Sequence, residues 1–193
     1  MSGPAVEHGN PRRGAVLTAA LTPGLHDAPA AAAGARVVIV ASSAHLRSPV
    51  AFDDLHFDFR PYDARAAYGR SKTANILFAV ALADRWADDG ITANALHPGG
   101  IMTNLQRHLP GEQLRAFGAA TSVLPAASPL VEGVTGRCFE DCGEAAVVHE
   151  RGSRARAGKR HERGSGMSGL APYAVDAADA DRLREETARL LGR

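Results

Sequence analysis

The sequence predicts an α/β fold built on a parallel sheet, and three stretches carry this prediction. Residues 36–41, RVVIVA, form an unbroken apolar run without the polar alternation of a sheet face that meets water. Such a run predicts a strand buried on both faces, as in a parallel sheet. An apolar helical pattern at 66–89 and a second strand pattern at 91–96 follow. Strand, helix and strand in this order are typical of a right-handed βαβ unit.

We expect this domain to span residues 15–149. Residues 1–14, rich in Gly, Pro and polar side chains, predict a disordered head. The Ala-rich stretch 15–33 predicts helix that two prolines interrupt. A further helix is expected at 111–124 and a third strand at 135–141.

Two segments follow the domain. Residues 150–169 predict a basic, Gly/Ser-rich linker. Residues 170–193 predict a C-terminal helical segment, with Asp176 as its N-cap and Glu185 and Arg189 as an i,i+4 ion pair.

The linker contains the sequence GSGMSG, residues 164–169, which matches the dinucleotide-binding pattern G-x-G-x-x-G. That pattern holds phosphates only between a buried strand and a helix. Here it follows a run of basic residues, and a proline stands where the helix should begin. We therefore interpret it as linker, and its arginines and lysines as a solvated insertion rather than a nucleic-acid-binding arm.

Composition and charge narrow the class of protein. The net charge of +1 gives no global field that would attract nucleic acid or an anionic membrane. No apolar run approaches the roughly 20 residues that span a bilayer, so we expect a cytoplasmic protein without membrane contact. The only cysteines, Cys138 and Cys142, lack the second pair of a zinc site and predict buried free thiols.

The chemistry suggested by the sequence lies in AAYGRSK, where Tyr68 and Lys72 stand four positions apart in the predicted helix. Side chains at this spacing share one helix face. The phenol of a free tyrosine has a pKa of about 10, and a neighbouring ammonium favours the phenolate. Such a pair suits general acid–base catalysis. Ser42, after the first strand, would place a hydroxyl where open α/β sheets bind ligands.

Three stretches, ARVVIVASSAHLRSPV, AAYGRSKTANILFAVALADRWADDGITANALHPGGIMTNL and GRCFEDC, together strongly resemble the short-chain dehydrogenase/reductase family. They are most similar to its retinol-dehydrogenase-like and WW-domain-oxidoreductase-like branch, which also carries a long insert where this chain has residues 43–67. The resemblance implies a Rossmann-type parallel sheet with flanking helices. It also implies hydride transfer between NAD or NADP and a small-molecule alcohol or carbonyl.

The resemblance assigns roles to individual residues. Ser42 matches the catalytic serine, with Ser43 as the adjacent alternative, Tyr68 the general acid–base, and Lys72 the lysine that assists it and binds the nicotinamide ribose. Tyr68 and Lys72 also belong to the implied cofactor site, with four residues of HPGGIMT: Pro98, Gly99, Ile101 and Thr103. His97 is interpreted as a turn residue. The 43–67 insert and the loops after Thr103 would line the substrate pocket, although ordinary packing is the favoured role for Phe57 and Phe59.

The family's first strands, glycine-rich turn and Asn-Asn-Ala-Gly segment have no match in this sequence. We therefore expect an N-terminally truncated C-terminal half with an incomplete sheet, in which the choice between NAD and NADP is unreadable. Two alternatives stay open. One is a non-catalytic truncated remnant, and the other is an interaction module that forms a homodimer through the 66–89 helix.

Because the glycine-rich turn is not found, we predict weak or absent NADH and NADPH binding by the 193-residue chain alone. Nucleotide fluorescence during titration of the purified chain measures this. Micromolar binding by a folded monomer would contradict the prediction.

Overall fold

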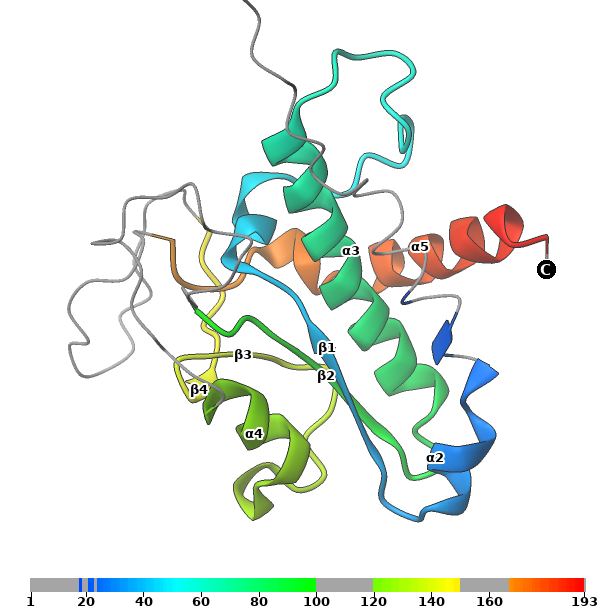
Figure 1. Ribbon diagram of the computed structural model, residues 1–193, viewed down its shortest axis with the longest axis vertical. Coiled ribbons are helices and arrows are strands. Elements are labelled where there is room, and N and C mark those ends of the chain that lie inside the picture. The colour runs from blue at the N-terminus through cyan, green and yellow to red at the C-terminus, as the bar shows by residue number, and fades with distance from the viewer. Residues whose placement is uncertain (1–17, 19–20, 23, 100–119, 150–166, 193) are drawn as a thin grey trace, which may run out of the picture.

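The computed structural model describes residues 18, 21–22, 24–99, 120–149 and 167–192, and its centre is a four-stranded sheet (Figure 1). The strand order is β1-β2-β3-β4. β1, β2 and β3 are parallel, and β4 pairs antiparallel with β3. The strands are β1 Arg36–Val40, β2 Thr92–Leu96, β3 Cys138–Glu140 and β4 Gly143–Glu144. This is an incomplete Rossmann-type α/β sheet, as predicted, and the short β4 is an addition that the sequence did not indicate.

The register of the strands brings their carboxyl ends to one edge of the sheet. β1 and β2 pair without a slip from Arg36 with Thr92 to Val40 with Leu96. The ladder extends beyond the strands, because the Ala41 amide donates to the Leu96 carbonyl at 2.7 Å. The segments that follow β1 and β2 therefore leave the sheet side by side.

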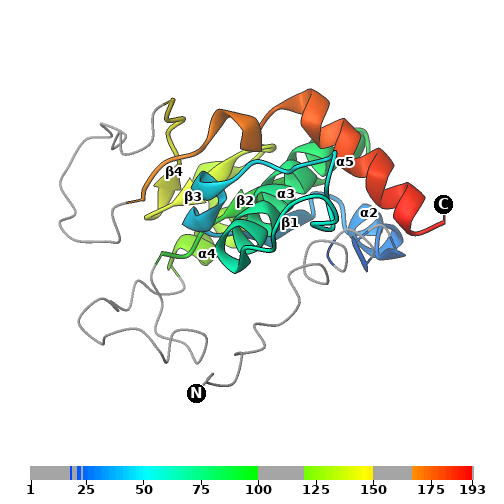
Figure 2. The same cartoon turned by 90° about the horizontal axis from the view of Figure 1, so that it is seen from above.

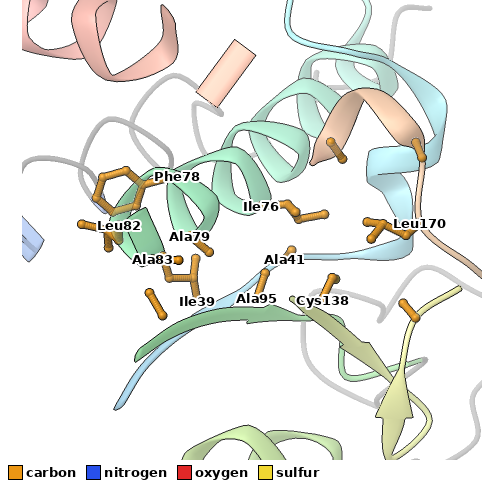
Figure 3. Packing of buried hydrophobic residues seen from close by; sticks show 14 of the residues in the cluster. Ile39, Ala41, Ile76, Phe78, Ala79, Leu82, Ala83, Ala95, Cys138 and Leu170 are labelled. Carbon is orange, nitrogen blue, oxygen red and sulfur yellow. The ribbon is translucent and has the colours of Figure 1, made fainter. Parts of the chain in front are cut away.

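Helices cover both faces of this sheet. Helix α3, Ala64–Arg85, packs on one face, and α4, Ala120–Ala127, lies on the other (Figure 3). Ile76 of α3 is 1% exposed, and burial of such a side chain contributes about 1.5–3 kcal/mol. Elsewhere the contact is made mostly by alanines, Ala79 and Ala83 from the helix and Ala95 from β2. Small side chains let the helix backbone approach the strands closely.

Local capping sets the bounds of α3. The Asp63 carboxylate accepts a hydrogen bond of 2.6 Å from the Ala66 amide, so the helix begins two residues before the predicted start at 66. It ends at Arg85 rather than 89, and the chain reverses through Gly90, whose φ of +67° suits glycine. Within the stretch 15–33, where a helix was predicted, the structure has the short helix α2, Asp27–Ala31.

The exposure of β1 corrects one expectation. The apolar run 36–41 predicted a strand buried on both faces, but only Ile39 of β1 is buried and Val40 is 51% exposed. The reason is that β1 is an edge strand of the described sheet.

The C-terminal part packs back on the domain. The 3-10 turn η5, Pro172–Ala174, leads into α5, Ala177–Leu190, which packs along α3 (Figure 2). Asp176 caps α5 as predicted, accepting from the Asp179 amide at 2.9 Å. The predicted ion pair is wrong, because Arg189 lies 3.4 Å from Glu186 instead of Glu185.

The two cysteines differ from each other. Cys138 is buried in the core as expected, and burial together with nearby Glu140 raises the pKa of its thiol to about 12. Cys142 is exposed, which corrects its predicted burial, because it lies in the tight turn between β3 and β4. Within the described ranges, no helix has the length and apolarity to cross a bilayer.

Helix α3 approaches the turn after β1 closely at Gly69. A Cβ atom at this position would lie 2.8 Å from the Ala44 carbonyl oxygen in the turn after β1. We predict that Gly69→Ala destabilises the protein, because overpacking costs roughly 1–3 kcal/mol and outweighs the ~1 kcal/mol that alanine gains in a helix. Chemical denaturation measures the change. Gly24→Ala is the control, since a Cβ there meets no atom within 4 Å. Equal stability of the two variants would contradict the prediction.

Candidate functional site

The first turns of α3 are held over the segment that leaves β1. The Asn75 side-chain amide donates to the Val40 carbonyl at 3.0 Å. The buried Thr73 hydroxyl lies 2.8 Å from the Ser48 carbonyl oxygen and 3.2 Å from that of His45. Together with the contact at Gly69, these bonds fasten α3 to both the end of β1 and the turn that follows it.

Ser42 stands at the start of that turn. It is the N-cap of the 3-10 helix η1, Ser43–Arg47, and its hydroxyl oxygen accepts a hydrogen bond of 3.2 Å from the Ala44 amide. The hydroxyl hydrogen has no acceptor among the residues that the structure describes, so it remains free to donate to a ligand oxygen. Ser43, the alternative, is the first residue of η1 itself.

Tyr68 and Lys72 lie together on the first turns of α3. The Lys72 ammonium is 5.4 Å from the centre of the Tyr68 ring, and the tyrosine is 37% exposed. Burial lowers the pKa of Lys72. In the described part of the chain no carboxylate pairs with this ammonium. A half-buried cation beside an accessible phenol is the arrangement that the spacing predicted.

Pro98 and Gly99 follow β2 and lie at the same edge of the sheet. Gly99 has a φ of +79°, a conformation that favours glycine, and its amide donates to the His97 ring at 3.4 Å. The structure therefore brings the five described site residues to one edge: Ser42, Tyr68, Lys72, Pro98 and Gly99. Ile101 and Thr103 lie outside the described residues.

Two histidines at this edge make buried hydrogen bonds that the sequence did not predict. His45 is fully buried and connects Ser42 with the C-terminal segment, and His97 is paired with buried Glu140 at 2.6 Å. His97 was expected to be an ordinary turn residue. The only sequence signal for His45 is its position three residues after Ser42, from which a ring nitrogen reaches back to the carbonyl that begins a tight turn.

The insert at 43–67 consists of η1, a loop at 48–63 and the first residues of α3, and the loop is fastened to α3. Buried Asp54 accepts from the Asp58 amide at 2.6 Å and lies 2.8 Å from the Arg60 guanidinium. The guanidinium of Arg70, from α3, stacks 4.2 Å above the Phe57 ring. Phe57 thus packs as expected, whereas Phe59 is 87% exposed.

Comparisons with known proteins show which family the chain resembles. The family model of short chain dehydrogenases matches residues 57–113, which include Tyr68, Lys72 and the turn after β2. A protein of Streptomyces lividans named "Probable oxidoreductase" is 49% identical over 186 residues, which cover 86% of this chain and 58% of that protein. Human retinol dehydrogenase 14 is 41% identical over 127 residues, which cover 58% of this chain and 38% of that protein.

A solved structure has a similar fold. An uncharacterised protein from Mycobacterium paratuberculosis superposes with a TM-score of 0.53 at 27% sequence identity, over 80% of this chain and 50% of that one.

An incomplete parallel sheet with helices on both faces defines the class as a Rossmann-type α/β fold. The chain belongs to the short-chain dehydrogenase/reductase family and is retinol-dehydrogenase-like. It spans little more than half the length of the Streptomyces relatives that it matches.

We predict that His45 makes the fold acid-sensitive. Burial lowers the pKa of this ring from its ordinary value of 6.5. The unfolded chain therefore takes up a proton below about pH 6.5 that the folded chain resists, so stability is complete above that pH and falls as pH decreases. Denaturation midpoints between pH 7.5 and 5.5 should fall less in His45→Gln than in wild type. His26, whose pKa is raised chiefly by Asp89, acts in the opposite direction but is present in both proteins.

The exposed His149 provides the control for this experiment, because His149→Gln should keep the wild-type slope. An identical slope for His45→Gln and wild type would show that His45 does not resist protonation.

Proposed function

We propose that the protein is an NAD(P)-dependent oxidoreductase that interconverts an alcohol and a carbonyl compound. The observation that carries the proposal is the Tyr68–Lys72 pair, held by α3 over the Ser42 turn at the carboxyl edge of the sheet. Ligands of open α/β sheets bind at this edge.

The residues present fit the nicotinamide half of a dinucleotide. Lys72 keeps a half-buried ammonium with no carboxylate partner among the described residues, and such a group is a donor for ribose hydroxyls. Gly99 follows β2 at the same edge, in a backbone conformation that favours glycine. When bound, the nicotinamide would supply or accept the hydride.

The chain's own residues would handle the proton and the substrate oxygen. Tyr68 takes the hydroxyl proton of an alcohol in oxidation, and returns a proton to the carbonyl oxygen in reduction. The free Ser42 hydrogen holds that oxygen beside the phenol, while the Lys72 ammonium stabilises the phenolate. Each role uses an atom that the structure leaves available.

The substrate class follows from the relatives' names. Because several relatives are named retinol dehydrogenases, we propose a hydrophobic primary alcohol or its aldehyde, bound beneath the 43–67 insert. A homodimer through α3 is the second proposal, and the packing of α5 along α3 leaves less of that helix free for it.

Tyr68→Phe removes one hydroxyl from an accessible side chain, so the fold should be unchanged. General acid–base transfer contributes about 10²–10⁴-fold, and we predict a loss of kcat in this range. The measurement is NADH and NADPH turnover by the full-length protein with retinal and a panel of aliphatic aldehydes. Ser122→Ala, which removes a hydroxyl from α4 on the other face of the sheet, is the control. More than a few per cent of wild-type turnover in Tyr68→Phe would refute the role.

Lys72→Ala should raise the KM for the dinucleotide and lower kcat together, because one ammonium serves both the ribose and the phenolate. Arg85→Ala, which removes an exposed cation from the other end of α3, should change neither. Steady-state kinetics with both nucleotides separate the two effects. A change in kcat without a change in the KM for the dinucleotide would refute the proposed contact between Lys72 and the cofactor.

A further inference from the structure

Residues 168–173, which we call the strap, connect two loops that are far apart in sequence. The strap includes the start of η5 and lies beside η1 and the end of β3 (Figure 1, orange). It is tied at Leu170 to the segment after β4: the Leu170 amide donates to the Ala146 carbonyl at 2.9 Å, and its carbonyl accepts from the Val148 amide at 2.9 Å. Leu170 itself enters the core (Figure 3). The predicted linker at 150–169 therefore ends before Ser168.

One arm of the strap reaches the Ser42 loop through His45. Nδ1 of this fully buried ring lies 2.8 Å from the Ser42 carbonyl oxygen, and Nε2 lies 3.2 Å from the Ala171 amide nitrogen. An N–H group facing Nε2 requires that nitrogen to accept, so the ring is neutral and carries its hydrogen on Nδ1. The Tyr173 hydroxyl also donates to the His45 carbonyl at 2.7 Å.

The other arm reaches the Gly99 turn through Glu140. The Glu140 carboxylate accepts from the Ser168 hydroxyl at 2.9 Å and from the Gly169 amide at 2.9 Å. It also pairs with His97 Nε2, which leaves Nδ1 to accept from the Gly99 amide. Burial raises the pKa of Glu140, but the bonds from His97, Gly169 and Ser168 outweigh it and hold the pKa below its ordinary value.

The close fit of Gly169 keeps this arm in place. Gly169 has a φ of +102°, and a Cβ atom there would lie 2.6 Å from a Val148 methyl carbon and 3.0 Å from the Ala146 carbonyl oxygen. The residue is therefore held in one backbone conformation, with its amide directed at Glu140.

Stability alone does not account for these groups. A buried carboxylate and two buried imidazoles cost desolvation, and apolar side chains of similar volume commonly give equal or greater stability. Both polar chains end instead on the backbone of the loops that carry Ser42 and Gly99. Precise placement of reacting groups is worth about 10²-fold per ångström.

We propose that the strap positions the Ser42 loop and the Gly99 turn relative to each other, with His45, Glu140 and His97 as positioning residues. The inference rests on the proposed function. Because each arm ends on a different loop, a substitution in one arm should affect one loop and leave the other unchanged. Loss of the Glu140 arm disturbs the cofactor turn, and loss of the Tyr173 arm disturbs the loop that holds the substrate oxygen.

The test compares Glu140→Gln and Tyr173→Phe in the full-length protein. Glu140→Gln should raise the KM for the dinucleotide by about 10- to 100-fold, with a smaller change in kcat. Tyr173→Phe should lower kcat and leave that KM unchanged. Controls are Glu144→Gln, at an exposed carboxylate on the next strand, and Ser122→Ala, which removes a hydroxyl from α4 on the other face of the sheet.

Amide hydrogen exchange supplies a readout that needs no activity. Exchange should accelerate at Gly99 in Glu140→Gln but not at Ala44, and at Ala44 in Tyr173→Phe but not at Gly99. If the wild-type protein turns over substrate and both variants lose only thermal stability, with kcat and KM unchanged, the positioning role of the strap is refuted. If the wild-type protein is inactive, the proposed function fails, and amide exchange becomes the only test of the strap's positioning role. In that case, equal acceleration at Gly99 and Ala44 in both variants, or no acceleration at either amide, would overturn that role.

Discussion

The close docking of α3 on the turn after β1 is the constraint on which the rest of the structure depends. Gly69 permits backbone-to-backbone contact with Ala44, and the Thr73 and Asn75 side chains bond to carbonyl groups of the turn and of β1. If the helix stood farther away, the Tyr68–Lys72 pair would face solvent without the Ser42 loop beside it. The close contact that leaves no room for a side chain at position 69 is also the contact that brings Tyr68 and Lys72 beside the Ser42 loop.

Parallel register is the second requirement. β1 and β2 pair without a slip, so the segments after Val40 and Leu96 leave the sheet at one edge. A shift of one residue would turn every side chain of a strand to the other face. The position of Pro98 and Gly99 near Ser42 therefore depends on the alanine-rich contacts that fix the strands beneath α3.

Buried polar groups gather at the edge that holds the candidate site. His45, His97 and Glu140 are each less than 9% exposed, and each has its hydrogen bonds satisfied by backbone or by another member. Other buried polar side chains, Asn94 in the middle of β2 and Thr121 of α4, lie outside this group. The sheet also has an open side at β1, where Val40 meets solvent. An apolar edge strand offers unpaired backbone groups to other chains.

The sequence by itself determined the α/β class, the order strand–helix–strand and the spacing of Tyr68 and Lys72, since these follow from local periodicity and from residue types in fixed positions. It also placed Ser42 at a strand end and identified the Asp176 cap. Tertiary structure alone decided that β1 lies at the edge, that Cys142 is exposed, and that Arg189 pairs with Glu186. It also brought Ser168 and Ala171 to Glu140 and His45, about which local sequence carries no information. Hydrogen bonds between residues 28 and 126 positions apart depend on how the chain packs, and no local pattern records them.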